Sequence, residues 1–209
     1  MQSHLIADFT VVGSQGCDVF DDIRAKKLIY HLTCLENMSS IFDNGLLPRA
    51  HLGGFVDVAD PKIIASRKGL CLEWYVPFHF FAKNPFDGRV QRDHPRKRFV
   101  LIAVQRSVAR ARGWKICPNH PLADAQIELL DYDAGMAAID WAAMSRRDYL
   151  DHYCKCVCMA ECLSPEPVSV EVFHSIYVKD AEAQAQVVTL MNRQPWPVHV
   201  DVAPMMFSK

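Results

Sequence analysis

A strand that carries two polar side chains and runs directly into a short helix constrains this sequence more than any other feature. His31 and Thr33 lie two residues apart in an apolar stretch, and on a β-strand such residues point to the same side. Residues 37–44 then have helical spacing of their apolar positions, and Gly45 supplies the stop. The combination predicts a small polar-lined pocket beside the strand, suited to a ligand with amide and hydroxyl groups.

Further strands and helices follow without regular alternation. We predict strands over residues 28–32, 74–81, 99–104, 160–163, 175–178 and 198–202, and helices over 37–44, 62–68, 107–112, 135–144, 146–153 and 180–191. This order favours an α+β fold over a doubly wound α/β sheet. A length of 209 residues suits one well-buried domain.

Composition excludes several classes of protein. No apolar run approaches the roughly 18–20 residues of a membrane span. The start, residues 1–8, has no basic segment and contains an acid, so it does not predict a secretory signal peptide. The eight cysteines are therefore expected to be reduced thiols, and we predict a cytoplasmic protein with no membrane segment.

Common nucleotide and metal motifs are missing. The sequence has no G-x-G-x-x-G after a strand, no phosphate loop of the Walker type and no H-E-x-x-H. Cys154, Cys156 and Cys158 alternate, and on a strand they would share one face about 7 Å apart, unlike the paired cysteines of structural zinc sites. We therefore expect a core-facing strand here, and no metal.

Three other features each allow two interpretations. The aromatic run 74–81 fits either the core or a pocket wall that stacks on a flat ring. Glu161 is a lone acid among apolar residues, and is either an outward-facing strand residue or a paired, working carboxylate. The basic stretches 89–98 and 106–115 fit either a solvated surface or a face that attracts phosphate.

Three segments, in this order, resemble the DarT family of NAD-dependent nucleic-acid ADP-ribosyltransferases, which are the toxins of toxin–antitoxin pairs. They are Tyr30–Thr33 with Asn37, Ile41 and Gly45–Leu46; Ile63–Arg67 with Val76–Phe80; and Ala160–Glu161, preceded by Ile139–Trp141 and followed by Ile176–Val178. The resemblance implies a single-domain ADP-ribosyltransferase-like fold, with a central split antiparallel β-sheet flanked by helices, over residues 28–209. Residues 1–27 would be an N-terminal extension.

The resemblance also implies roles for individual residues. Glu161 would be the catalytic acid, and Arg67 would contact the NAD phosphates and help to activate the reacting base. The NAD co-substrate would be bound by His31, Thr33, Asn37, Gly45, Arg67 and Phe78. The nucleic acid would be bound by Arg89, Arg92, Arg96, Lys97, Arg146 and Arg147. Arg49 is the alternative to Arg67, and His79 stands where the family resemblance implies Tyr.

The implied function is transfer of ADP-ribose from NAD to thymine or guanine in single-stranded DNA. A DarG-like macrodomain antitoxin would be the protein partner. Three alternatives remain: the same fold acting on RNA or protein, an inactive module that binds NAD or nucleic acid, and a small Cys/His metalloprotein.

Overall fold

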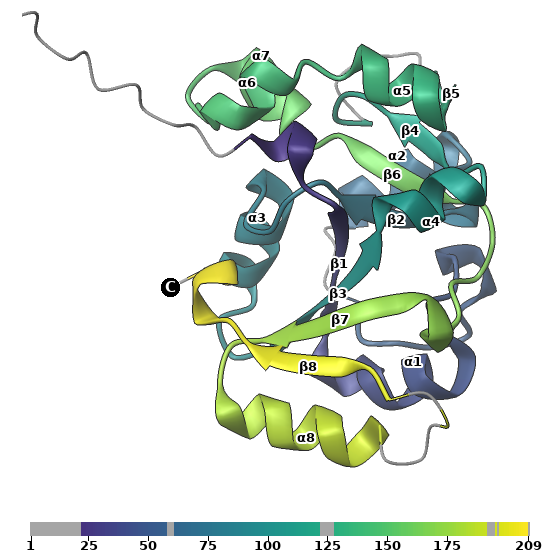
Figure 1. Cartoon of the computed structure of the whole chain (residues 1–209), viewed down its shortest axis with the longest axis vertical. Coiled ribbons are helices and arrows are strands. Elements are labelled where there is room, and N and C mark those ends of the chain that lie inside the picture. The colour runs from purple at the N-terminus through teal and green to yellow at the C-terminus, as the bar shows by residue number, and fades with distance from the viewer. Residues whose placement is uncertain (1–21, 58–60, 122–127, 192–194, 196, 209) are drawn as a thin grey trace, which may run out of the picture.

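Eight strands form one sheet in the computed structural model, which describes residues 22–57, 61–121, 128–191, 195 and 197–208 (Figure 1). The strands are β1 (Leu28–Cys34), β2 (Val76–His79), β3 (Phe99–Gln105), β4 (Lys115–Cys117), β5 (Leu130–Asp131), β6 (Glu161–Ser164), β7 (Phe173–Val178) and β8 (His199–Val202). The helices are α1 (Met38–Asn44), α2 (Pro61–Gly69), α3 (Pro85–Asp93), α4 (Arg106–Ala111), α5 (Tyr132–Ala138), α6 (Trp141–Arg146), α7 (His152–Val157) and α8 (Ala181–Met191). The predicted single α+β domain is confirmed.

The sheet is divided in its middle. Its strand order is β5-β4-β6-β2-β1-β3-β7-β8. β1 pairs with β3 along its whole length, but β1 pairs with β2 at one position, where Tyr30 lies opposite His79. Two half-sheets therefore meet at this seam, as the predicted split sheet requires. The pairing is antiparallel except between β7 and β8, which are parallel because α8 makes the crossover between them.

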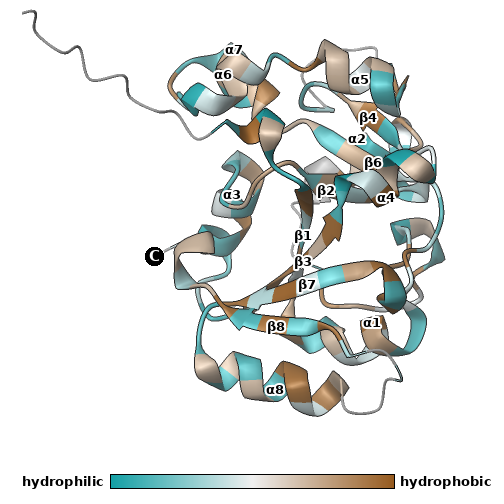
Figure 2. Ribbon diagram, viewed as in Figure 1, coloured by the Kyte–Doolittle hydropathy of each residue, from teal (hydrophilic) through white to brown (hydrophobic). Residues whose placement is uncertain are grey.

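Apolar patterning explains the elements nearest the seam. All of β3 except Gln105 is buried, and the inner face of α1 buries Met38, Ile41 and Phe42. In Figure 2 the hydrophobic colouring follows the central strands, whereas α8 alternates between hydrophobic and hydrophilic residues. None of the helices in the described part of the chain has the length and apolar character needed to cross a lipid bilayer.

Glycine is required where α1 ends. Gly45 has a φ of 77°, and a Cβ built on it would lie 2.6 Å from the carbonyl oxygen of Val168. The next residue, Leu46, exchanges two backbone hydrogen bonds of 2.9 Å with Val168. The predicted helix stop at Gly45 is confirmed, and close approach of a second backbone segment adds to the need for glycine.

The cysteine-rich segment is helical, so the prediction of a strand there was wrong. Cys154 of α7 and Cys158, the residue that caps the C-terminal end of this helix, lie one turn apart, and their thiols contact the carbonyl oxygens of Ala143 and Met144 at 2.9 and 3.6 Å. Burial raises the pKa of the Cys158 thiol to about 12. The spacing of the cysteines at every second residue resembled a strand, but the segment packs as a helix against α6.

Two further helical features differ from the expectation. The predicted helical stretch over 135–153 is broken into short helices, because Asp140 caps the start of α6 and Arg147 ends it with a φ of 52°. Helix α3 was not predicted. Its N-terminus is capped by Asn84, whose side chain accepts a 2.9 Å hydrogen bond from the amide of Asp87.

The residues just before β1 belong to the packed structure. Ile23 is fully buried, and the guanidinium of Arg106 donates hydrogen bonds to the carbonyl oxygens of Ile23, Arg24, Leu28 and Phe80. Ile23 therefore contributes to the core, and the backbone of residues 23 and 24 is fixed to α4, whereas the other side chains of residues 22–27 are exposed. Residues 1–21 lie outside the described residues, and the boundary of an N-terminal extension at residue 27 stays a prediction.

Candidate active site

A cavity of about 400 Å³ occupies the split between β1 and β2. Past the Tyr30–His79 pair the two strands have no further backbone pairing, and the cavity lies where they separate. Residues from β1, α1, the loop 45–57, α2, β2 and β6 line it. They include His31, Thr33, Asn37, Gly45, Arg49, Asp57, Arg67, Glu73, His79, His120 and Glu161.

His31 is a neutral hydrogen-bonding group in the cavity wall. Its Nδ1 lies 2.8 Å from the carbonyl oxygen of Pro77, across the split. A carbonyl oxygen only accepts, so Nδ1 carries the proton and Nε2 is left as an acceptor. Burial lowers the pKa of His31 to about 4, so the ring is uncharged at neutral pH.

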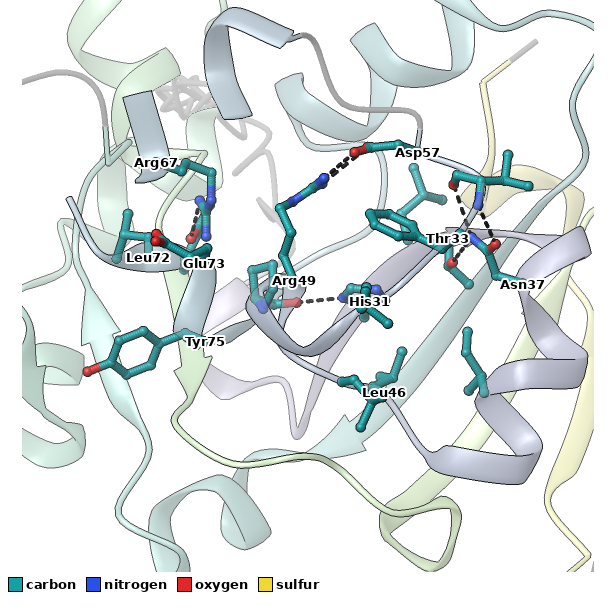
Figure 3. Close-up of a pocket in the computed structure, with 18 of the residues that line it drawn as sticks. His31, Thr33, Asn37, Leu46, Arg49, Asp57, Arg67, Leu72, Glu73 and Tyr75 are labelled. Atoms are coloured by element: carbon teal, nitrogen blue, oxygen red, sulfur yellow. Dashed lines mark hydrogen bonds and ion pairs between the residues drawn. The ribbon is translucent and has the colours of Figure 1, made fainter. Parts of the chain in front are cut away.

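Asn37 ties β1 to the loop that borders the cavity. Its side-chain amide donates to Thr33 Oγ1 at 3.3 Å and to the carbonyl oxygen of Val56 at 3.1 Å. Its carbonyl oxygen accepts from the backbone amide of Val56 at 3.0 Å. These bonds orient the Thr33 hydroxyl and fix the loop, as Figure 3 shows.

Arg67 and Glu161 form an ion pair in the wall of the cavity. Nη1 of Arg67 donates to both carboxylate oxygens of Glu161, at 2.7 and 2.9 Å. The Arg67 side chain is 16 % exposed and that of Glu161 is 8 % exposed. The fold therefore joins a helix residue and a strand residue 94 positions apart into one charged unit that faces the cavity.

A second arginine binds a different acid elsewhere on the wall. The guanidinium of Arg49 is ion-paired with Asp57, and it lies 5.0 Å from the centre of the Phe55 ring. Figure 3 shows the Arg49 side chain turned toward Asp57, and Arg67 farther to the left of the view, on the side of Arg49 away from His31. Arg67, and not Arg49, contacts Glu161.

The structure brings together all but one of the predicted NAD-binding residues. His31, Thr33, Asn37, Gly45 and Arg67 line the cavity, together with Glu161, the predicted catalytic acid. Phe78 does not, contrary to its expected place in the pocket wall. It is fully buried, and the centre of its ring lies 5.1 Å from the centre of the Trp114 ring, on which it stacks. Its strand neighbours Pro77 and His79 face the cavity instead. Phe78 also contacts the His31 ring at 5.7 Å, so it supports the wall from behind.

The predicted nucleic-acid residues lie outside the cavity wall, in two groups. Arg89, Arg92, Arg96 and Lys97 are on α3 and the turn after it, and Arg146 and Arg147 are at the end of α6. The ammonium of Lys97 lies 3.9 Å from a carboxylate oxygen of Glu36, which lines the cavity. The guanidinium of Arg147 lies over the Phe81 ring at 4.8 Å. Their contact with nucleic acid stays a prediction.

Sequence reasoning missed several cavity residues, and two of them, His120 and Glu73, are titratable groups without a motif. His120 follows β4 in a loop without any motif, and burial lowers its pKa. Glu73 lies in the short helical turn Leu72–Trp74, and its Oε2 is buried without a partner among the described residues. In the same part of the chain, no group of three or more His, Cys, Asp or Glu side chains is arranged to hold a metal ion.

A buried acid behind the cavity predicts an unusual dependence of stability on pH. Asp87 of α3 is 1 % exposed, and burial raises its pKa to about 6, against opposing effects of His79 and Asn84. A carboxyl whose pKa is raised by folding stabilises the native state below about pH 4. This contribution is lost as the pH rises through 6.

Asp87→Asn is therefore expected to raise the free energy of unfolding at pH 7.5 by about 1–3 kcal/mol, and to change it little near pH 4. Urea denaturation of both proteins at the two pH values measures this difference. A variant less stable than wild type at pH 7.5 would contradict the expectation.

Comparison with known proteins identifies the family. The family model described as DarT, ssDNA thymidine ADP-ribosyltransferase, matches residues 30–208. Among curated proteins none matches.

Solved structures share the fold at low sequence identity. Thermus sp. 2.9 DarT in complex with ADP-ribosylated ssDNA is 15 % identical, with a TM-score of 0.74 over 87 % of this chain and 96 % of that one. The same protein in complex with NAD+ gives a TM-score of 0.69, at 15 % identity over 87 % and 98 %. Thermosipho africanus DarTG in complex with ADP-ribose is 21 % identical, with a TM-score of 0.71 over 87 % of this chain and 51 % of that one. With the family model matched over nearly the whole described chain, this protein belongs to the DarT family of single-stranded-DNA thymidine ADP-ribosyltransferases.

Proposed function

We propose that Glu161 and Arg67 carry out the transfer of ADP-ribose from NAD to thymidine in this chain. A DarT protein is an NAD-dependent ADP-ribosyltransferase of single-stranded DNA. The observation that supports these residue roles is the Arg67–Glu161 ion pair, which faces the same cavity as His31 and Thr33.

NAD would lie across the split, with its nicotinamide end against β1. The unprotonated Nε2 of His31 would accept a hydrogen bond from the amide or a ribose hydroxyl, and Thr33 Oγ1 is held by Asn37 for a second bond. Gly45 lines the same cavity with its backbone, and the close approach of Val168 excludes a side chain at this position. Arg67 would contact the phosphates, and Arg49 is the alternative.

The chemistry suits a carboxylate at Glu161. Breaking the bond between nicotinamide and C1′ of the ribose develops oxocarbenium-like positive charge, which a neighbouring carboxylate stabilises. A ring nitrogen of the base then forms the new bond to C1′. Thymidine has one ring N–H, at N3, and its proton would leave to Glu161. Arg67 would orient the base and hold the carboxylate in place.

A single-stranded target follows from the same step. N3 of thymine is occupied by base pairing in a duplex, so it is free to attack only where the base is unpaired. Guanine, RNA and protein are the alternative acceptors. The basic residues of α3 and of the end of α6 would bind the phosphate backbone.

A partner and a location follow from the proposed reaction. We propose a macrodomain-type antitoxin that removes the mark, supported by the resemblance to Thermosipho africanus DarTG, of which this chain covers 51 %. We also propose that the protein acts in the cytoplasm, since NAD and DNA are its substrates.

The test incubates the protein with NAD and single-stranded oligonucleotides, followed by mass spectrometry. The expected result is a gain of one ADP-ribose on a thymidine-containing strand, and none on a matched strand without thymidine or on the duplex. If only the thymidine-free strand or only RNA were modified, the acceptor would be another base or RNA instead of thymidine in DNA. No product on any acceptor would favour an inactive binding module.

A further inference from the structure

His79 occupies the one position where both half-sheets meet. It is the last residue of β2, and it lies opposite Tyr30 of β1 and opposite Glu161 of β6. β1 carries His31 and Thr33, and β6 carries Glu161. The backbone of a single residue therefore joins the strand proposed to hold NAD to the strand that bears the carboxylate.

The side chain of His79 makes a second connection to the same strand. Its Nδ1 lies 3.2 Å from the carbonyl oxygen of Ala160. As with His31, the carbonyl accepts, so Nδ1 carries the proton. This carbonyl belongs to the peptide group that links Ala160 to Glu161. A hydrogen bond to it fixes the plane of that peptide, and with it the direction in which the Glu161 side chain leaves the backbone.

The ring of His79 is itself held in place. It is 6 % exposed, and its centre lies 5.6 Å from the ring of Phe86 on α3. The next residue on that helix, Asp87, is buried and interacts electrostatically with His79. A ring packed on a capped helix N-terminus has little freedom to turn, so its Nδ1–H is a fixed donor.

We propose that His79 is a positioning residue for Glu161, acting through the Nδ1–H hydrogen bond to Ala160 at the seam of the sheet. The inference rests on the proposed role of Glu161. It assigns His79 no contact with the reacting atoms. Displacement of a catalytic group by about 1 Å lowers rates roughly 100-fold, so loss of this bond should act on kcat rather than on NAD binding.

Three substitutions distinguish the effect of the hydrogen bond on turnover from the effect of the aromatic ring. His79→Asn places an amide N–H where Nδ1 stands, His79→Gln places it nearer to the position of Nε2, and His79→Phe keeps the ring and removes the donor. His174→Phe is the matched control, because His174 is exposed on β7 and outside the cavity wall. For each protein, kcat and KM for NAD are measured with a thymidine oligonucleotide, together with Kd for NAD and the melting temperature.

The expected result is a selective loss of turnover. His79→Phe and His79→Gln should lower kcat about 10–100-fold with Kd for NAD within about 3-fold of wild type, and His79→Asn should recover most of kcat. The inference is overturned if His79→Phe keeps kcat, if Kd for NAD rises while kcat is unchanged, or if His79→Asn loses as much kcat as His79→Phe. If the wild type shows no transfer to any acceptor, the proposed function fails instead. If His79→Phe does not fold, kcat of His79→Asn is compared with kcat of His79→Gln. A higher kcat for His79→Asn supports the inference, and equal values overturn it.

Discussion

Replacing Glu161 with glutamine is expected to lower the rate of ADP-ribose transfer about 10²–10⁴-fold while leaving NAD affinity within a few-fold of wild type. The amide has the shape of the carboxylate but carries no negative charge to stabilise the oxocarbenium-like ribose, and it is a poor proton acceptor. It still accepts a hydrogen bond from Arg67, so the cavity keeps its form. The residues proposed to bind the nicotinamide end of NAD lie on β1 and are untouched.

The measurement compares kcat, KM for NAD and Kd for NAD in wild type and Glu161→Gln. Glu171→Gln is the matched control, because Glu171 is exposed in the turn Val170–Val172 and outside the cavity wall. The control should retain full activity. If Glu161→Gln keeps more than about a tenth of the wild-type kcat, the carboxylate does not carry the reaction.

Replacing Arg106 with methionine is expected to destabilise the fold by about 3–5 kcal/mol. Arg106 is 6 % exposed, and its guanidinium bonds carbonyl oxygens from three separate segments, including those of Ile23 and Phe80. Burial lowers its pKa. The carbonyl oxygens would remain buried without donors after the substitution. The substitution would also remove the positive charge that lies over the rings of Phe80 and Trp141.

Urea denaturation gives the change in the free energy of unfolding. The control is Arg110→Met on the same helix, whose side chain is 65 % exposed and pairs with Asp133 on the surface. That change should alter stability by less than about 1 kcal/mol. Equal unfolding midpoints for Arg106→Met and wild type would show that Arg106 does not hold the segment before β1 in place.

Local patterns predicted the elements that local forces determine. β3 is a continuous apolar run with buried residues on both faces, and the helix stop at Gly45 has a positive φ, which glycine adopts readily. Burial of His31 and Thr33 in one wall follows from their spacing of two. Helix α3 was not predicted. Its sequence is rich in charged residues and was read as a basic stretch, although Asn84 caps its start.

Non-local contacts decided the remainder. No local pattern indicates that Arg67 and Glu161 form an ion pair, and only the resemblance to a family brought them together beforehand. The expectation that Phe78 binds NAD rested on the resemblance to a family, and the aromatic segment by itself fitted either the core or a pocket wall. The alternation of β2 divides that segment between two faces, and Phe78 falls on the face with Trp114. The cysteines of α7 were misassigned, because their spacing alone does not show that α6 packs beside them.

The interleaving of the two half-sheets along the chain has a consequence for synthesis on the ribosome. β1 and β3 belong to one half, and β2 lies between them in the sequence but belongs to the other. A nascent chain cannot complete either half from a continuous segment. Assembly of the cavity must wait until β6, which begins at Glu161, has emerged. A truncated translation product ending before β6 would therefore lack the ion pair, and transfer activity would arise only late in synthesis.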